Sequence, residues 1–126
     1  MGERVVVVGG TGPTGIPLVR GLVERGHDVT IIHRGTHESP DTPAVVRHMH
    51  CDPYDAASFA DAIRGNTFDL AVVMYGRLRM IADAFVGSVG RLVSVGGVPA
   101  YRGWMNPFTH APNGLPVPVS ETAAVA

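Results

Sequence analysis

Four glycines stand within seven residues near the start of the chain, where residues 9–15 read Gly-Gly-Thr-Gly-Pro-Thr-Gly. Four consecutive valines at 5–8 come directly before them, and an amphipathic segment begins at Ile16. Such a valine run is typical of a strand buried on both faces, so the order is strand, glycine-rich turn and helix. Glycines in this context allow a tight turn, and the start of the helix can bind phosphate through its free N–H groups and its dipole. The pattern therefore predicts a phosphate-binding turn.

The glycines fit two spacings, Gly10-x-Gly12-x-x-Gly15 and Gly9-x-x-Gly12-x-x-Gly15. Between a strand and a helix, the second spacing resembles the signature of the NAD-dependent epimerase/dehydratase family, the extended short-chain dehydrogenase/reductases. The resemblance implies a dinucleotide-binding site, and a glycine-rich turn without a ligand is the alternative. The residues of the turn that the resemblance assigns to the cofactor are Gly9, Gly10, Thr11, Gly12, Pro13, Thr14 and Gly15.

The end of the second predicted strand, over residues 29–33, indicates which dinucleotide binds. An acidic residue at this point would bind the ribose 2′-hydroxyl of NAD. The chain has His33 and Arg34 there instead, and no carboxylate before Glu38. Arginine is a planar, bidentate partner for a 2′-phosphate. We therefore predict His33 and Arg34 at the cofactor and NADP(H) in preference to NAD(H), with a merely solvated Arg34 as the alternative.

A third strand is predicted over residues 45–51, after a proline-containing loop at 35–44 that replaces a crossover helix. Asp52 and Pro53 follow this strand. In the family that the chain resembles, an Asp after the third strand borders the adenine ring. The resemblance therefore implies that Asp52 and Pro53 contact the cofactor.

Two histidines of the third predicted strand could suggest a metal site. His48 and His50 are two residues apart, so they project from the same face of the strand. Two imidazoles supply only two ligands, whereas a zinc site takes at least three from the protein, and the sequence offers no evident third. We therefore predict no metal site, and we expect Cys51 to be a small buried apolar residue.

The remaining elements complete the expected fold. A helix is predicted over residues 56–64, and two further strands over 68–74 and 91–95. Alternating strands and helices predict an α/β fold: a Rossmann-like open parallel sheet of five strands in the order 3-2-1-4-5, with flanking helices. The ligand crevice should lie outside the carboxyl ends of the strands. Tyr75 and Gly76 follow the fourth strand and resemble the family's turn over which the cofactor's ribose lies.

The family's chemistry depends on a tyrosine with a lysine four residues later, whose charge lowers the pKa of the tyrosine. All ten basic residues of this chain are arginine, so it contains no lysine. Tyr101 has the required spacing to Met105, which carries no charge. We therefore predict no catalytic residue and assign Tyr101 to the wall of the pocket.

The chain is expected to have two parts. Residues 1–97 are predicted to be the NAD(P)-binding domain, and residues 98–126, with five of the ten prolines, an irregular tail. The tail resembles the loop before the catalytic helix of the family. We therefore expect a truncated protein that corresponds to the first half of a family member, without the catalytic and substrate-binding part.

The leading functional hypothesis is an NAD(P)-binding domain that is not catalytically competent alone. One alternative is a non-enzymatic NADP(H) sensor or interaction module. Another is a half-enzyme completed by a second chain, as a homo-oligomer or with a partner. A net charge of −1 argues against binding to nucleic acid, and no apolar run is long enough to cross a membrane. The absence of room for a signal peptide before the first strand, together with a single cysteine, favours the cytoplasm.

Overall fold

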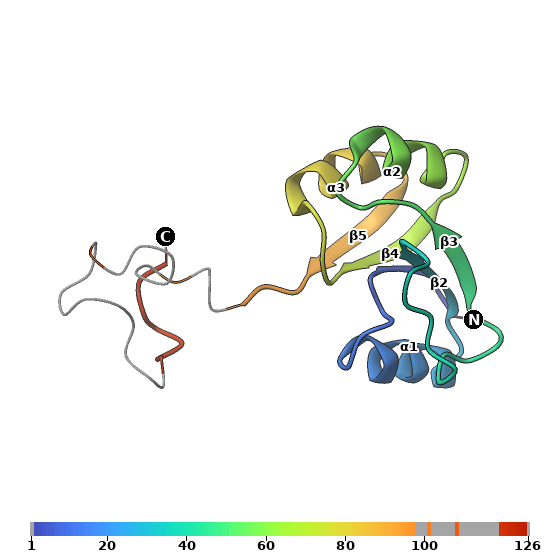
Figure 1. Cartoon of the computed structure of the whole chain (residues 1–126), viewed down its shortest axis with the longest axis horizontal. Helices are drawn as coiled ribbons and strands as arrows, with labels where there is room; N and C mark the ends of the chain where they lie inside the picture. Colours follow the sequence, from blue (N-terminus) through green and yellow to red (C-terminus); the bar gives the residue numbers. More distant parts are fainter. Residues whose placement is uncertain (1, 98–100, 102–107, 109–118, 126) are drawn as a thin grey trace. The chain divides into compact units, whose positions relative to one another are not determined.

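The valine run forms the middle strand of a five-stranded parallel sheet in the computed structural model of the chain (Figure 1). The chain divides into two compact units, Met1–Val95 and Gly96–Ala126, and the sheet belongs to the first. The structure describes residues 2–97, 101, 108 and 119–125.

Strands and helices alternate along most of the first unit. The strands are β1 (Arg4–Val8), β2 (Asp28–His33), β3 (Arg47–His50), β4 (Phe68–Val73) and β5 (Val89–Ser94). The helices are α1 (Gly15–Glu24), α2 (Ala56–Ile63) and α3 (Leu78–Phe85). Neighbouring strands run parallel in the order β3-β2-β1-β4-β5, which confirms the predicted fold class and strand order.

Different helices cover the two faces of the sheet. Helix α1 lies on one face, and α2 and α3 lie on the other (Figure 1). Because successive strand residues point to opposite faces, Val5 and Val7 pack in the cluster that contains Val19 of α1. Val6 and Val8 pack in the cluster that contains Phe59 of α2. All four valines are fully buried, so β1 holds the turn that follows it in a fixed position.

The third strand is shorter than predicted. It spans Arg47–His50 rather than residues 45–51. Val45 is 73% exposed, and the Val46 N–H donates to the Pro43 carbonyl at 3.0 Å, so the chain is still turning where the strand was expected to begin. Residues 34–46 contain no helix, as the loop prediction requires.

Helix α2 begins as the sequence indicates. Asp55 precedes the helix in an extended conformation, and its carboxylate accepts a hydrogen bond from the Ala57 N–H at 3.0 Å. This is the geometry of an N-cap, which satisfies a backbone donor that has no partner within the helix. Phe59 and Ile63 then anchor the helix to the sheet, because both are buried.

In the second unit, Tyr101 and Val125 form an antiparallel bridge. Most of the tail predicted over residues 98–126, including Met105, lies outside the described residues. No helix in the described part of the chain is both long and apolar enough to cross a membrane.

Candidate functional site

The glycine-rich turn extends the hydrogen bonding of the sheet by one residue before the chain turns towards α1. The Gly9 N–H donates to the Ile32 carbonyl of β2 at 2.9 Å. Gly9 and Gly10 both have a φ angle of +100°, which residues with a side chain rarely adopt. The pair of glycines is therefore what lets β1 pass directly into the turn.

Gly15 and Gly12 have different roles in this turn. A Cβ atom at Gly15 would lie 2.3 Å from the Gly10 Cα, so glycine is needed for α1 to begin this close to the end of β1. A Cβ atom at Gly12 would meet no described atom within 4 Å. Gly15 is thus required by the fold, whereas Gly12 leaves open space at the start of α1 that a phosphate can approach.

A cleft of about 330 Å³ opens beside the turn. Its volume lies at the lower end of the range for small-molecule sites. The cleft joins the turn to the end of β2 and to the residues after β4, as the strand order requires. Its lining includes nine residues predicted from the sequence, namely Gly9, Gly10, Thr11, Gly12, Thr14, Gly15, His33, Arg34 and Tyr75.

Four other predicted residues do not line this cleft: Pro13, Asp52, Pro53 and Gly76. The Asp52 carboxylate accepts a hydrogen bond from the Tyr54 N–H at 2.9 Å. Pro53 is buried, and its carbonyl accepts from the Arg77 N–H at 3.3 Å. The second of these hydrogen bonds joins the segments that follow β3 and β4. The predicted contact of these four residues with a cofactor stays a prediction.

Four residues that line the cleft were missed by the sequence reasoning: Thr36, His37, Met74 and Val95. Met74 and Val95 are the first residues after β4 and β5. Because the carboxyl ends of parallel strands meet at one edge, taking the residue after each predicted strand would have found both. Thr36 and His37 lie in the loop after β2, where no periodicity indicates which side chains turn inwards.

Positive charge is available in the cleft. Arg34 lines it and is exposed, and none of the described lining residues carries a carboxylate. The nearest acidic residue in sequence is Glu38, whose Oε1 lies 3.0 Å from the His50 Nε2. Glu38 therefore already has a partner outside the lining of the cleft.

Three histidines meet beside the cleft because of the register between β2 and β3. His33 pairs with His50, and Ile31 pairs with His48. His48 and His50 lie two residues apart, so they share the face of the sheet on which His33 stands. The His33 Nε2 lies 2.9 Å from the His48 Nδ1, and the rings of His33 and His50 are 4.7 Å apart.

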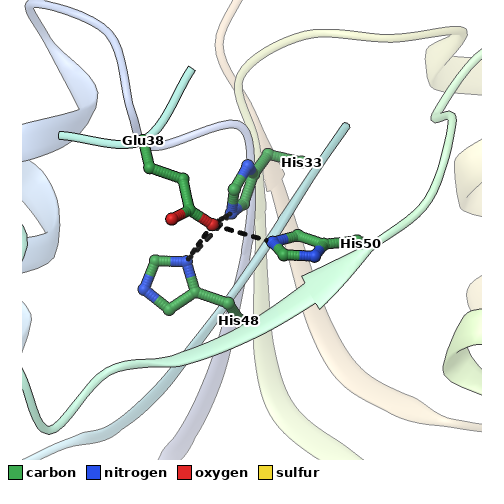
Figure 2. A group of neighbouring side chains, drawn as sticks. All are labelled: His33, Glu38, His48 and His50. Atoms are coloured by element: carbon green, nitrogen blue, oxygen red, sulfur yellow. Dashed lines mark hydrogen bonds and ion pairs between the residues drawn. The ribbon is translucent and has the colours of Figure 1, made fainter. Parts of the chain in front are cut away.

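Glu38 completes this group, which we call the histidine cluster: His33, Glu38, His48 and His50. One carboxylate oxygen of Glu38 points towards all three rings (Figure 2). It lies 3.9 Å from the nearest nitrogen of His33 and of His48. The sequence offered no evident third ligand beside His48 and His50, but the register of two strands and a loop residue bring a third imidazole and a carboxylate to them. That no metal binds stays a prediction.

The charge state of His33 follows from its surroundings. Burial lowers the pKa of His33, and the neighbouring His50 and His48 lower it further, while Glu38 acts in the opposite direction. The ring is therefore held neutral. Its Nδ1 accepts a hydrogen bond from the Gly35 N–H at 3.0 Å, so the proton of the neutral ring lies on Nε2 and is donated to His48.

A sequence comparison identifies the family. The model of the NAD dependent epimerase/dehydratase family matches residues 5–86. This chain belongs to that family. The matched region contains the glycine-rich turn, Arg34 and the histidine cluster. A comparison with curated proteins finds no match.

Solved structures share the fold of this epimerase/dehydratase-family chain. WbmG of Bordetella bronchiseptica, in complex with NAD and UDP, has a TM-score of 0.73 at 18% identity, covering 100% of this chain and 44% of WbmG. Vestitone reductase of alfalfa has a TM-score of 0.62 at 24% identity, over 79% of this chain and 37% of the reductase. A short-chain dehydrogenase/reductase of Veillonella parvula has a TM-score of 0.63 at 14% identity, over 85% and 51%. The chain thus spans about half of these proteins or less.

The family's dinucleotide can be tested against the residues present. The close contact of Gly15 with Gly10, the open space at Gly12 and the exposed Arg34 fit a phosphate-containing ligand. The family's tyrosine–lysine pair cannot form within these 126 residues, because they contain no lysine. The first unit therefore has the family's NAD-binding fold.

The thiol of Cys51, directly after β3, has low reactivity. Burial raises the pKa of the Cys51 thiol, and the negative charge of Asp52 raises it further. A thiol with a raised pKa is protonated at neutral pH and is a weak nucleophile.

Proposed function

We propose that this chain binds NADP(H) in the cleft beside the glycine-rich turn, with Arg34 against the 2′-phosphate. The observation that carries this proposal is the composition of the cleft, which joins the turn to Arg34 and contains no carboxylate among its described lining residues. WbmG, which shares the fold, was solved with NAD, so a dinucleotide suits this architecture. The phosphates would lie at the start of α1, over Gly12.

The charges favour NADP(H) over NAD(H). A carboxylate beside the ribose would accept hydrogen bonds from the hydroxyls of NAD but would repel a 2′-phosphate. Here the Glu38 carboxylate faces the three histidines of the cluster, and Arg34 is exposed at the cleft. A guanidinium can donate two parallel hydrogen bonds to a phosphate, and such charge-assisted bonds are about twice as strong as neutral ones.

We further propose that these 126 residues bind cofactor without turning over the family's substrates. The chemistry of the family needs a cation beside a tyrosine, and the sequence contains no lysine that could serve. Incubation with NADPH and carbonyl or nucleotide-sugar substrates should therefore leave the cofactor unoxidised and unlabelled in a deuterium-exchange assay. Substrate-dependent turnover by the purified chain would contradict this part of the proposal.

Isothermal titration calorimetry with four cofactor forms tests the binding proposal. Arg34→Ala should weaken NADP(H) by about tenfold or more, the equivalent of one charge-assisted hydrogen bond, and should leave NAD(H) unchanged. Arg64→Ala is the matched control, since Arg64 is an exposed arginine whose ion pair to Asp61 lies on α2. Equal affinity of the unaltered protein for NAD(H) and NADP(H) would refute the preference, and no binding of either would refute the proposal.

A second candidate is a half-enzyme that self-associates along β5. Leu92 and Val93 of β5 are 37% and 52% exposed, and Val95 directly after it is 55% exposed. Exposed apolar side chains at a sheet edge favour association. Sedimentation velocity should then show a dimer that Val93→Asp dissociates, whereas Val86→Asp, at a residue 82% exposed after α3, should not. A monomer at all concentrations would exclude this candidate.

A further inference from the structure

We propose that the histidine cluster is a binding site for one divalent transition-metal ion of the zinc class. The site would take the His33 Nε2, the Glu38 Oε1, the His48 Nδ1 and the His50 Nε2 as ligands. This inference does not rest on cofactor binding, since its evidence is the arrangement of these four side chains and its test contains no cofactor.

The spacing of the four atoms suits a tetrahedral ion. Bonds of about 2.0–2.1 Å in a tetrahedral zinc site place neighbouring ligand atoms about 3.3 Å apart. In the cluster, the four candidate atoms lie within 4.8 Å of one another. The two shortest separations are 2.9 Å, between His33 and His48, and 3.0 Å, between Glu38 and His50. Small side-chain rotations would bring all four atoms to one ion.

The chemistry of the donors selects the class of ion. Three imidazoles and one carboxylate match the nitrogen-rich sites of zinc and its neighbours in the transition series. Calcium and magnesium prefer six or more oxygen ligands, and this cluster offers a single carboxylate. The Glu38 charge would also offset half of the charge of a divalent ion.

The protein supports three of these ligands on its sheet. His33 is 3% exposed at the end of β2, and His48 and His50 are held opposite that strand by the parallel register. Glu38 comes from the loop between β2 and β3 and lies over the three rings (Figure 2). Its side chain is 54% exposed, so an ion can enter from the side of Glu38.

Without an ion, hydrogen bonds connect the same groups. The His33 Nε2–H is donated to His48, because the His33 Nδ1 accepts from the Gly35 N–H. Ligation through Nε2 requires the proton of His33 to move to Nδ1, where it would face the Gly35 N–H. The Gly35 peptide must then turn, which is feasible for an exposed glycine with a φ angle of +79°.

The test uses the whole untagged chain after treatment with a chelator, so that no added histidines compete. Titration with cobalt(II) should give the visible absorption of a tetrahedral ion and saturate at one ion per chain, and zinc should displace it. In calorimetry, the double variant His48→Ala with His50→Ala should bind zinc at least about 100-fold more weakly, since changing even outer-shell partners costs 10–100-fold. Glu38→Gln should lose about tenfold or more.

The control is His37→Ala, which removes a neighbouring exposed histidine outside the cluster and should bind zinc like the unaltered protein. Circular dichroism checks that each variant is folded, which is expected because His48 and His50 are exposed. In NMR spectra, zinc should shift the Gly35 amide resonance more than that of Gly65, a distant exposed glycine with a similar φ of +75°. Equal zinc affinity of the unaltered protein and the double variant would overturn the proposal, as would an octahedral cobalt spectrum.

Discussion

The glycine-rich turn and one member of the histidine cluster, His33, line the same cleft, but the turn and the cluster are built in opposite ways. The turn is made of backbone: its shape depends on positive φ angles and on the close contact of Gly15 with Gly10. The cluster is made of side chains that come from two strands and a loop. His33 belongs to both, because it lines the cleft and contacts the other histidines.

This difference decides whether a substitution changes the fold, the binding of a ligand, or both. A backbone-built site has its geometry fixed by the fold, so a wrong residue disturbs the fold and the binding together. A side-chain-built site on exposed residues can lose its ligands while the fold remains. The four predictions below use that distinction.

The largest effect is expected at the turn. Gly15→Ala would place a Cβ atom 2.3 Å from the Gly10 Cα, and the three nearest atoms all belong to the Gly10 backbone, which cannot move aside as a flexible side chain could. We expect a loss of about 3 kcal/mol in the free energy of unfolding, at the upper end for overpacking, together with loss of NADP(H) binding. Urea denaturation and calorimetry measure the two quantities.

Gly12→Ala is the matched control for this prediction. Its Cβ would meet no described atom within 4 Å, so stability should change by less than about 1 kcal/mol. Binding of NADP(H) should nevertheless weaken, because the methyl group would occupy space at the start of α1. If Gly12→Ala and Gly15→Ala destabilised the protein equally, the separation of their roles would be wrong.

A smaller effect is expected when the shared residue is removed. His33→Ala takes away the acceptor of the Gly35 N–H and the donor to His48. Each of these two hydrogen bonds contributes about 0.5–1.5 kcal/mol, so thermal unfolding of the chelator-treated protein should show a loss of about 1–3 kcal/mol. His37→Ala, at an exposed residue of the same loop, should be nearly neutral. A loss below about 0.5 kcal/mol for His33→Ala would mean that water replaces the ring.

A pH dependence should follow from the same histidine in the chelator-treated protein. Burial, His50 and His48 lower the pKa of His33 in the folded state below the usual value of about 6.5, against the opposing Glu38. Between these two pKa values the unfolded chain binds more protons than the folded one. The contribution of His33 to the free energy of unfolding is therefore fully present above pH 6.5 and is lost as the pH falls through the folded pKa. Unfolding curves at a series of pH values give the slope of the free energy of unfolding against pH, and this slope should be smaller in His33→Ala. An equal slope in the variant would mean that other groups cause the pH dependence.

The smallest effect is expected for Glu38→Gln without metal. The side chain of Glu38 is 54% exposed, so its attraction to the rings is weakened by solvent. The free energy of unfolding of the chelator-treated variant should change by less than about 0.5 kcal/mol. The contrast with its expected loss of zinc affinity would show that Glu38 serves the ion rather than the fold, and a large loss of stability would contradict this.

The sequence was sufficient for the fold and for the turn because both depend on local patterns. The valine run, the glycine spacing and the alternation of strands with helices each lie within short segments, and together they predicted the strand order. The start of β3 was misplaced because Val45 and Val46 are β-branched residues typical of strands, although in the structure they belong to a turn. A hydrogen bond to Pro43 is not visible in such a pattern.

The histidine cluster was missed because it depends on register. Strand order alone makes β2 and β3 neighbours, and the pattern His-x-His fixes only that His48 and His50 share a face. Whether His33 lies opposite His50 or one residue away decides between a cluster and its absence, since a shift of one residue reverses the faces. Glu38 was beyond prediction for another reason, because a loop has no period.

The position of β3 has a consequence for hydrogen exchange. Within the described residues β3 has four residues and pairs only with β2, whereas β1 is hydrogen-bonded on both sides and fully buried. Amides of β1 should therefore exchange with solvent only through global unfolding, while those of β3 exchange through local opening of the edge. Such opening would separate His48 and His50 from His33 while the glycine-rich turn stays formed. A metal ion held by both strands would close that edge and slow its exchange.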